Sequence, residues 1–89
     1  MARGDLGTVM EAEIAARGGA AEQLFNLGML YAIGRDVPQD FVAAHKWFNL
    51  AAMRGNQEAK ARRAEVALEM SPAQIADAQR EARAWLIAH

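Results

Sequence analysis

The sequence contains no cysteine, and this absence removes several kinds of chemistry. A chain without thiols forms no disulfide, has no thiolate nucleophile and offers no thiolate ligand to a metal. β-Branched residues are also scarce, with a single threonine, whereas alanine, leucine, methionine and charged residues dominate. Because β-branched side chains lose rotamer freedom in a helix, their scarcity favours helices over strands. We therefore expect an all-α protein.

Long apolar runs and an excess of one charge are missing as well. No segment approaches the roughly 18 apolar residues of a membrane helix, and charged side chains interrupt the start of the chain where a signal peptide has its apolar core. The 11 acidic residues nearly balance the 10 basic ones, for a net charge of −1, so no overall field attracts nucleic acid or a membrane. We expect a soluble, cytoplasmic protein without a membrane partner.

Apolar residues recur at helical spacing through the 89 residues, a length that suits one domain. A first helix is predicted from about residue 5 to residue 17, before the glycine pair at 18–19. Its predicted buried face consists of Leu6, Val9, Met10 and Ile14. A second helix is predicted from about residue 20 to residue 33, where Gly28 lets a neighbouring helix approach closely.

The third helix is predicted at 41–54, after a loop that runs from Gly34 to Gln39. Asp40 precedes this helix and is expected to cap it, because its side-chain oxygen can accept a hydrogen bond from a free backbone N–H. The predicted buried stripe comprises Phe41, Ala44, Phe48, Ala51 and Ala52, widened by Trp47 and Leu50. Aromatic side chains at this spacing are expected to lie in the core rather than to bind a cofactor.

Two more helices complete the predicted set of about five. The fourth runs from about residue 57 to residue 69, with Ala61, Ala64 and Leu68 on its expected buried face. The fifth begins with the sharpest local signal in the chain, since Ser71 and Gln74 form a capping-box pattern with proline between them. Its predicted buried residues are Ile75, Ala78, Ala82, Trp85 and Leu86.

An internal repeat appears when the chain is compared with itself. Residues 14–16 followed by Gly19 match residues 50–52 followed by Gly55, about 36 residues later. A period in the thirties built from two helices indicates a stacked helical array. We therefore divide the single domain, 1–89, into a half-repeat at 5–18, a full helix pair at 20–54, a half-repeat at 56–69 and a C-terminal capping helix at 72–88.

Several of these segments together resemble the Sel-one-like repeat, a tetratricopeptide-like family. The matching stretches are Leu27-Gly28-x-x-Tyr31, Gly34-x-Asp36-Val37-x-Gln39-Asp40, Ala44-x-x-Trp47, Ala51-Ala52 and Gly55-Asn56-x-Glu58-Ala59. The family pattern usually has a second glycine where Asp36 stands. The end of the chain, residues 70–75 and 83–85, resembles the tails of small bacterial members.

The resemblance implies an α/α right-handed superhelix that acts as an adaptor or scaffold for another protein or peptide. In similar arrays the first helix of each pair lines the concave face, and carrying those positions over gives a predicted partner-binding set. This set consists of Glu22, Phe25, Met29 and Ile33, with Arg62 and Glu65 as a polar rim. Phe25 and Met29 lie off the core stripe of their helix, as interface residues often do. The alternative is that the first helix covers both.

Other functions find less support in the residues. No nucleophile elbow, phosphate-binding glycine loop or zincin signature occurs, so we predict no enzyme, no catalytic residue and no cofactor. Neither His45 nor His89 has further ligands at metal-binding spacing, so we predict no metal site.

Two alternatives to partner binding stay open. The chain could be a structural homodimer or a fragment of a longer array. It could also bind nucleic acid through Arg54, Lys60, Arg62 and Arg63, although acidic residues lie among them and no aromatic residue is available to stack on bases. A solvated face of mixed charge is the prediction for this cluster, with no nucleic-acid partner.

Overall fold

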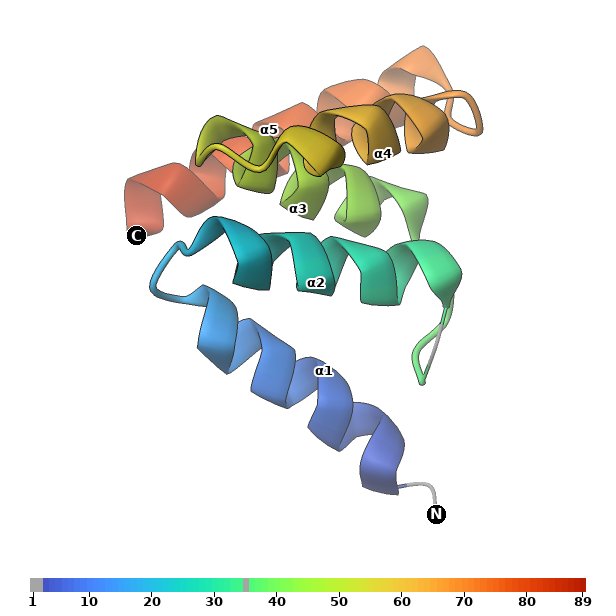
Figure 1. Ribbon diagram of the computed structural model, residues 1–89. Coiled ribbons are helices and arrows are strands. Elements are labelled where there is room, and N and C mark those ends of the chain that lie inside the picture. Colours follow the sequence, from blue (N-terminus) through green and yellow to red (C-terminus); the bar gives the residue numbers. More distant parts are fainter. Residues whose placement is uncertain (1–2, 35) are drawn as a thin grey trace.

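Five helices form the part of the protein that the computed structural model describes, residues 3–34 and 36–89 (Figure 1). They are α1 (Arg3–Ala16), α2 (Ala21–Ile33), α3 (Phe41–Met53), α4 (Gln57–Ala67) and α5 (Pro72–Ala88). The described residues contain no strand, which confirms the all-α prediction. The side chain of Leu6, predicted to be buried, lies outside the described residues.

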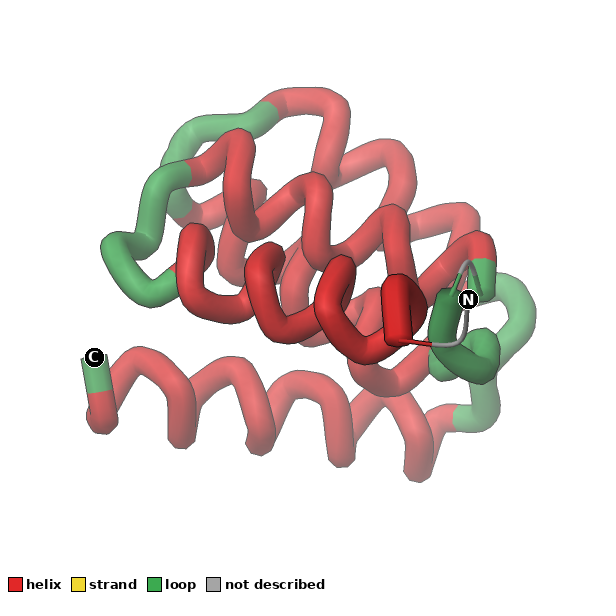
Figure 2. The backbone as a smooth tube through the Cα atoms, turned by 90° about the horizontal axis from the view of Figure 1, so that it is seen from below, coloured by secondary structure: helices red, strands yellow, loops and turns green. Residues whose placement is uncertain are grey.

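Helix α3 is the centre of the stack. It packs against α2, α4 and α5, while α1 packs against α2. The helices lie side by side, and the connecting loops gather at the two ends of the stack (Figure 2). The largest fully buried side chains come from the two central helices: Leu24 and Leu27 of α2, and Phe48 and Leu50 of α3. The core therefore lies mainly between the two helices of the predicted full pair.

The close approach of α2 and α3 depends on Gly28. A Cβ atom placed on Gly28 would lie 2.6 Å from Cδ1 of the Phe48 ring, which is fully buried. Carbon atoms in contact are normally about 3.5–4.0 Å apart, so no larger residue fits without a shift of the ring or of the helices. The predicted role of this glycine is confirmed.

The helix starts follow the predicted caps. The carboxylate of Asp40 accepts a hydrogen bond from the backbone N–H of Ala43 at 3.0 Å. At the start of α5, the backbone N–H of Gln74 donates to Ser71 Oγ at 3.1 Å, and the backbone N–H of Ser71 donates to Gln74 Oε1 at 2.9 Å. The predicted capping box is thus complete, and each bond satisfies a backbone group that the helix end leaves free.

The loop between α2 and α3 keeps a left-handed turn despite the missing glycine. Asp36 has a φ of 67°, in the region that aspartate tolerates better than most residues. The loop is fastened to the end of α2, because the N–H of Asp40 donates to the carbonyl of Tyr31 at 3.0 Å and Gln39 Nε2 donates to the carbonyl of Ala32 at 2.8 Å. These bonds fix the direction in which α3 begins.

The predicted buried face of α1 was wrong in part. Val9 is buried as expected, but Met10 and Ile14 are 59% and 57% exposed, and the buried strip continues through Ala16 instead. The reason is tertiary: α1 packs on α2 alone among its close neighbours, so only a narrow strip of its surface is covered. Helical periodicity locates an apolar face, but it does not supply the second neighbour that would bury the whole of it.

The predicted buried face of α4 was also wrong. Ala61, Ala64 and Leu68 are all exposed, Leu68 by 85%, whereas Ala59 and Val66 are buried. Arg62 and Arg63 lie between these two positions on the helix and are partly buried. Arginine can cover apolar surface with its aliphatic stem while its charged end reaches a polar partner. Because charged residues occupy part of the packed side of α4, the spacing of apolar residues in the sequence does not identify its buried face.

Candidate functional site

The side chains predicted to bind a partner on α2 form one row along the helix. Phe25, Met29 and Ile33 follow one another at intervals of four residues, so they lie on the same side. Phe25 and Met29 are partly buried and pack against the core, and the Phe25 ring lies 5.5 Å from the ring of Phe48. Ile33, at the end of the helix, is 59% exposed, and Glu22 at the start is also exposed. The row thus consists of two side chains packed against the core, Phe25 and Met29, and one accessible apolar side chain, Ile33.

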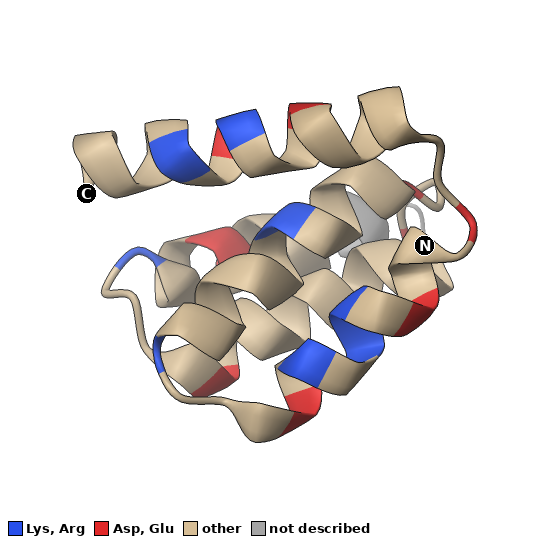
Figure 3. Cartoon of the chain, turned by 90° about the horizontal axis from the view of Figure 1, so that it is seen from above, with Lys and Arg blue, Asp and Glu red and all other residues tan. Residues whose placement is uncertain are grey.

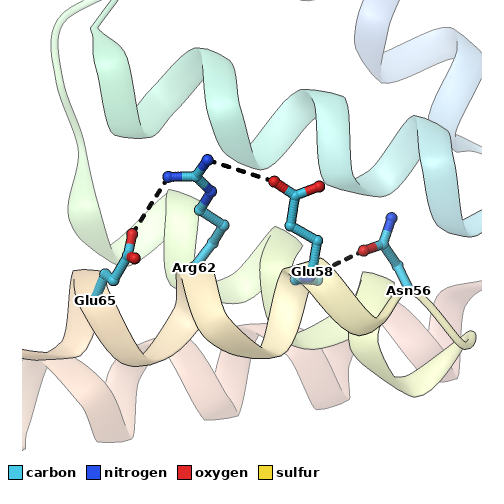
Figure 4. A network of polar contacts seen from close by, with 5 residues as sticks. Asn56, Glu58, Arg62 and Glu65 are labelled. Carbon is cyan, nitrogen blue, oxygen red and sulfur yellow. Dashed lines mark hydrogen bonds and ion pairs between the residues drawn. The ribbon is translucent and has the colours of Figure 1, made fainter.

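The two predicted rim residues on α4 belong to one charged network. Arg62 Nη2 lies 3.4 Å from Glu58 Oε2, and Arg62 Nη1 lies 3.4 Å from Glu65 Oε1. Figure 4 shows the guanidinium between the two carboxylates, on one side of the helix, with Asn56 at the helix start. Asn56 Oδ1 accepts from the N–H of Ala59 at 2.9 Å and is a cap that the sequence analysis did not identify. The network presents two acidic groups and one arginine to solvent.

The basic cluster considered for nucleic acid is largely engaged with the protein itself. Arg54 donates to the carbonyl of Gly19 at 3.3 Å, and Arg63 donates to Asn49 Oδ1 on α3. Arg62 is held by its two carboxylates. Along α4, Lys60, Arg62 and Arg63 stand between Glu58 and Glu65, so both signs of charge share this helix (Figure 3). These contacts favour the predicted mixed-charge face, because charges that already have partners offer less to phosphate groups.

His45 is the one polar side chain among the described residues that is buried in the core, at 4% exposure. Its Nδ1 atom has no hydrogen-bond partner in the described part of the chain. Burial lowers the pKa of His45 below its ordinary value of 6.5, and the charge of Arg63 lowers it further. When the chain is aligned with itself at the repeat period of 36 residues, His45 corresponds to the apolar residue Val9. This correspondence indicates a buried position for His45.

Two further features are absent from the part of the chain that the structure describes. No group of three or more histidine, aspartate or glutamate side chains lies close enough to hold a metal ion there. Within the same residues, no helix combines the length and the apolar character that crossing a membrane requires.

The stacked helices and the period in the thirties define an α-helical repeat protein. Within this class, the family model for the Sel1 repeat matches residues 21–56, from the first residue of α2 to the cap of α4. This match agrees with the resemblance found in the sequence. No curated protein and no solved structure matches the chain. Sel1 repeats generally act as protein-interaction modules rather than as enzymes.

Proposed function

We propose that this protein is an adaptor or scaffold that binds a partner protein or peptide through the row on α2, with the α4 network as a polar rim. The proposed contact residues are Glu22, Phe25, Met29, Ile33, Arg62 and Glu65. The observation that carries the proposal is the accessible apolar row on a helix of the matched Sel1 repeat. A cytoplasmic location belongs to the same proposal, since a chain without cysteine is compatible with a reducing compartment.

The row has the features of an interface anchor. Phe25 and Met29 are held against the core, so they lose little further freedom when a partner covers them. Ile33 exposes more than half of its surface, and removing that surface from water favours binding. Charged groups around an apolar centre match the usual division of an interface into a core and a rim.

Affinity capture with two matched variants tests the proposal. Ile33 and Met53 are the last residues of α2 and α3, and their exposures are 59% and 57%. Ile33→Glu places a charge in the row, whereas Met53→Glu makes the same kind of change outside it and has a similar effect on the helix end. A partner retained by the wild type and by Met53→Glu, but lost with Ile33→Glu, supports the proposal. Its Kd is then measured with the purified partner.

Circular dichroism and urea unfolding establish that both variants keep the fold. Equal capture by all three proteins shows that the partner binds another surface and contradicts the proposed row. Loss with both variants to the same degree contradicts it as well, because the effect is then one of charge at a helix end and does not depend on the row.

Self-association is the second candidate, and the exposed face of α1 favours it. Met10 and Ile14 lie one turn apart and are both more than half exposed. An apolar helix face without a neighbour is the surface on which a repeat array or a dimer continues. Sedimentation equilibrium of the wild type and of Ile14→Glu measures this. A dimer that Ile14→Glu dissociates supports self-association, and a monomer in both cases contradicts the dimer.

A further inference from the structure

The outer face of α1 is apolar and exposed. Within the described residues, α1 packs against α2 and lies at one edge of the stack (Figure 1). Val9 and Ala16 are buried, whereas Met10 and Ile14, one turn apart, are more than half exposed on the side away from α2. An apolar helix face of this kind is normally covered by another helix. The charges around it indicate which helix fits.

Charged side chains flank this face in a symmetrical order. Glu11 precedes Ile14 by three residues and Arg17 follows it by three, so each lies about 4.5 Å from Ile14 along the helix axis, on opposite flanks. The backbone N–H of Arg17 donates to the carbonyl of Ile14 at 3.2 Å, which keeps Arg17 in the last turn. Both charged side chains are exposed, and the described residues contain no ion pair for either. The flank of Arg17 also carries Glu13, and both line a cleft of about 200 Å³ with Trp47, Trp85 and His89.

A second copy of the chain carries the matching surface. In an antiparallel pair of α1 helices related by a two-fold axis at Ile14, Glu11 of each copy lies beside Arg17 of the other. The two Ile14 side chains meet at the axis, and Met10 lies over Gly18 of the second copy. A Cβ atom placed on Gly18 would meet no atom within 4 Å, so that surface is open. One face therefore supplies both an apolar contact and two ion pairs.

The charges select this arrangement among the antiparallel ones. Contact between Met10 and Ile14 of the second copy also matches apolar side chains, with the axis between the two positions. That register places Glu11 beside Glu13 of the second copy, so like charges meet twice. The register centred on Ile14 replaces these two repulsions with two attractions. The self-complementary charges of the α1 face therefore favour a second copy of this chain as the occupant.

We propose that two copies of this chain form an antiparallel dimer through α1, with Ile14 on the two-fold axis and reciprocal ion pairs between Glu11 and Arg17. The proposal rests on the self-association put forward above and specifies its geometry. The 14 residues of α1 span about 21 Å, so a contact of one helix with one helix buries less than the roughly 1,200 Å² of the smallest standard interfaces. The dimer is therefore weak, with a Kd of about 10–1,000 µM, and weaker still in high salt.

Sedimentation equilibrium at protein concentrations from about 10 µM to 1 mM measures the dimer. We expect Ile14→Glu, Glu11→Arg and Arg17→Glu each to raise the Kd at least about tenfold. The matched controls are Glu69→Arg and Arg83→Glu, which change the charge by the same amounts at exposed positions outside α1 and should leave the Kd unchanged. Circular dichroism and urea unfolding establish that every variant keeps the fold.

A mixture of the two charge variants distinguishes this dimer from other forms of self-association. When Glu11→Arg meets Arg17→Glu, both pairs across the interface join opposite charges, so the mixture should dimerise about as tightly as the wild type. The double variant, Glu11→Arg with Arg17→Glu, keeps the net charge of the wild type and should dimerise by itself for the same reason.

The possible failures have separate meanings. A wild type that stays monomeric contradicts self-association altogether, and this dimer with it. A wild-type dimer that Ile14→Glu dissociates leaves self-association standing, but it overturns the antiparallel arrangement if the single charge variants dimerise as before. The arrangement is also overturned if the mixture and the double variant fail to restore the dimer.

Discussion

Replacing Gly28 with alanine tests the packing at the centre of this fold. Gly28 lies within α2, where alanine is normally the better residue by about 0.8–1.0 kcal/mol of helix propensity. If the position were open, Gly28→Ala would therefore stabilise the protein. In the structure the new Cβ meets three atoms of the Phe48 ring at 2.6, 2.7 and 3.1 Å. The two effects have opposite signs, so the measured sign decides between them.

The magnitude follows from the rigidity of the contact. Phe48 is fully buried, and its ring has no flexible end that could move aside. Overpacking of a filled core costs about 1–3 kcal/mol, and the propensity gain offsets about 1 kcal/mol of this. We expect Gly28→Ala to lower the free energy of unfolding by up to about 2 kcal/mol. For a domain of this size each 1 kcal/mol lowers Tm by roughly 4–8 °C.

Urea unfolding followed by circular dichroism provides the measurement. Asn26→Ala, at an exposed position of the same helix, is the matched control and should be neutral or slightly stabilising. Phe48→Leu removes the ring, and in that background Gly28→Ala should cost less, with a coupling energy of about 0.5–3 kcal/mol. A Gly28→Ala protein that is more stable than the wild type by about 1 kcal/mol, the gain expected at an open helix position, would refute the close contact between α2 and α3.

Three further predictions concern titration, capping and surface charge. Because the folded-state pKa of His45 is lowered, the unfolded chain binds a proton at this residue more readily, and the free energy of unfolding should fall as pH decreases below about 6.5. Urea unfolding between about pH 7.5 and 5 should show that the free energy of unfolding depends less on pH in His45→Leu than in the wild type. An unchanged pH dependence would contradict the buried neutral histidine. Ser71→Ala should cost about 1 kcal/mol in urea unfolding, because it removes the acceptor for the Gln74 N–H, whereas Ser71→Asp should retain most of the stability. Arg62→Ala should change the free energy of unfolding by less than about 1 kcal/mol, because its ion pairs are exposed, and any loss of stability should be smaller in high salt. A large loss that does not depend on salt would show that packing of the aliphatic stem of Arg62 stabilises the fold more than its charge does.

The candidate surfaces were predictable to different degrees. The row on α2 followed from helical spacing and from the resemblance, and the structure shows that its residues share one side of the helix. Whether a partner binds there is left to the capture experiment. A cleft lined by Glu13, Arg17, Trp47, Trp85 and His89 was not predicted. The spacing of the two tryptophans in the sequence is that of core residues, and Glu13 and Arg17 are distant from them along the chain.

The sequence by itself determined the local structure of this protein. Hydrogen bonds between neighbours along the chain set where the helices begin, as at Asp40 and Ser71, and these depend on residue types a few positions apart. The tertiary structure alone decided which face of α1 and α4 is buried, because burial depends on how many neighbours a helix has and on where long side chains such as Arg63 extend. It also decided that the end of α1 and the end of α5 lie at the same end of the stack (Figure 1), because helix packing, and no spacing in the sequence, sets their distance in space.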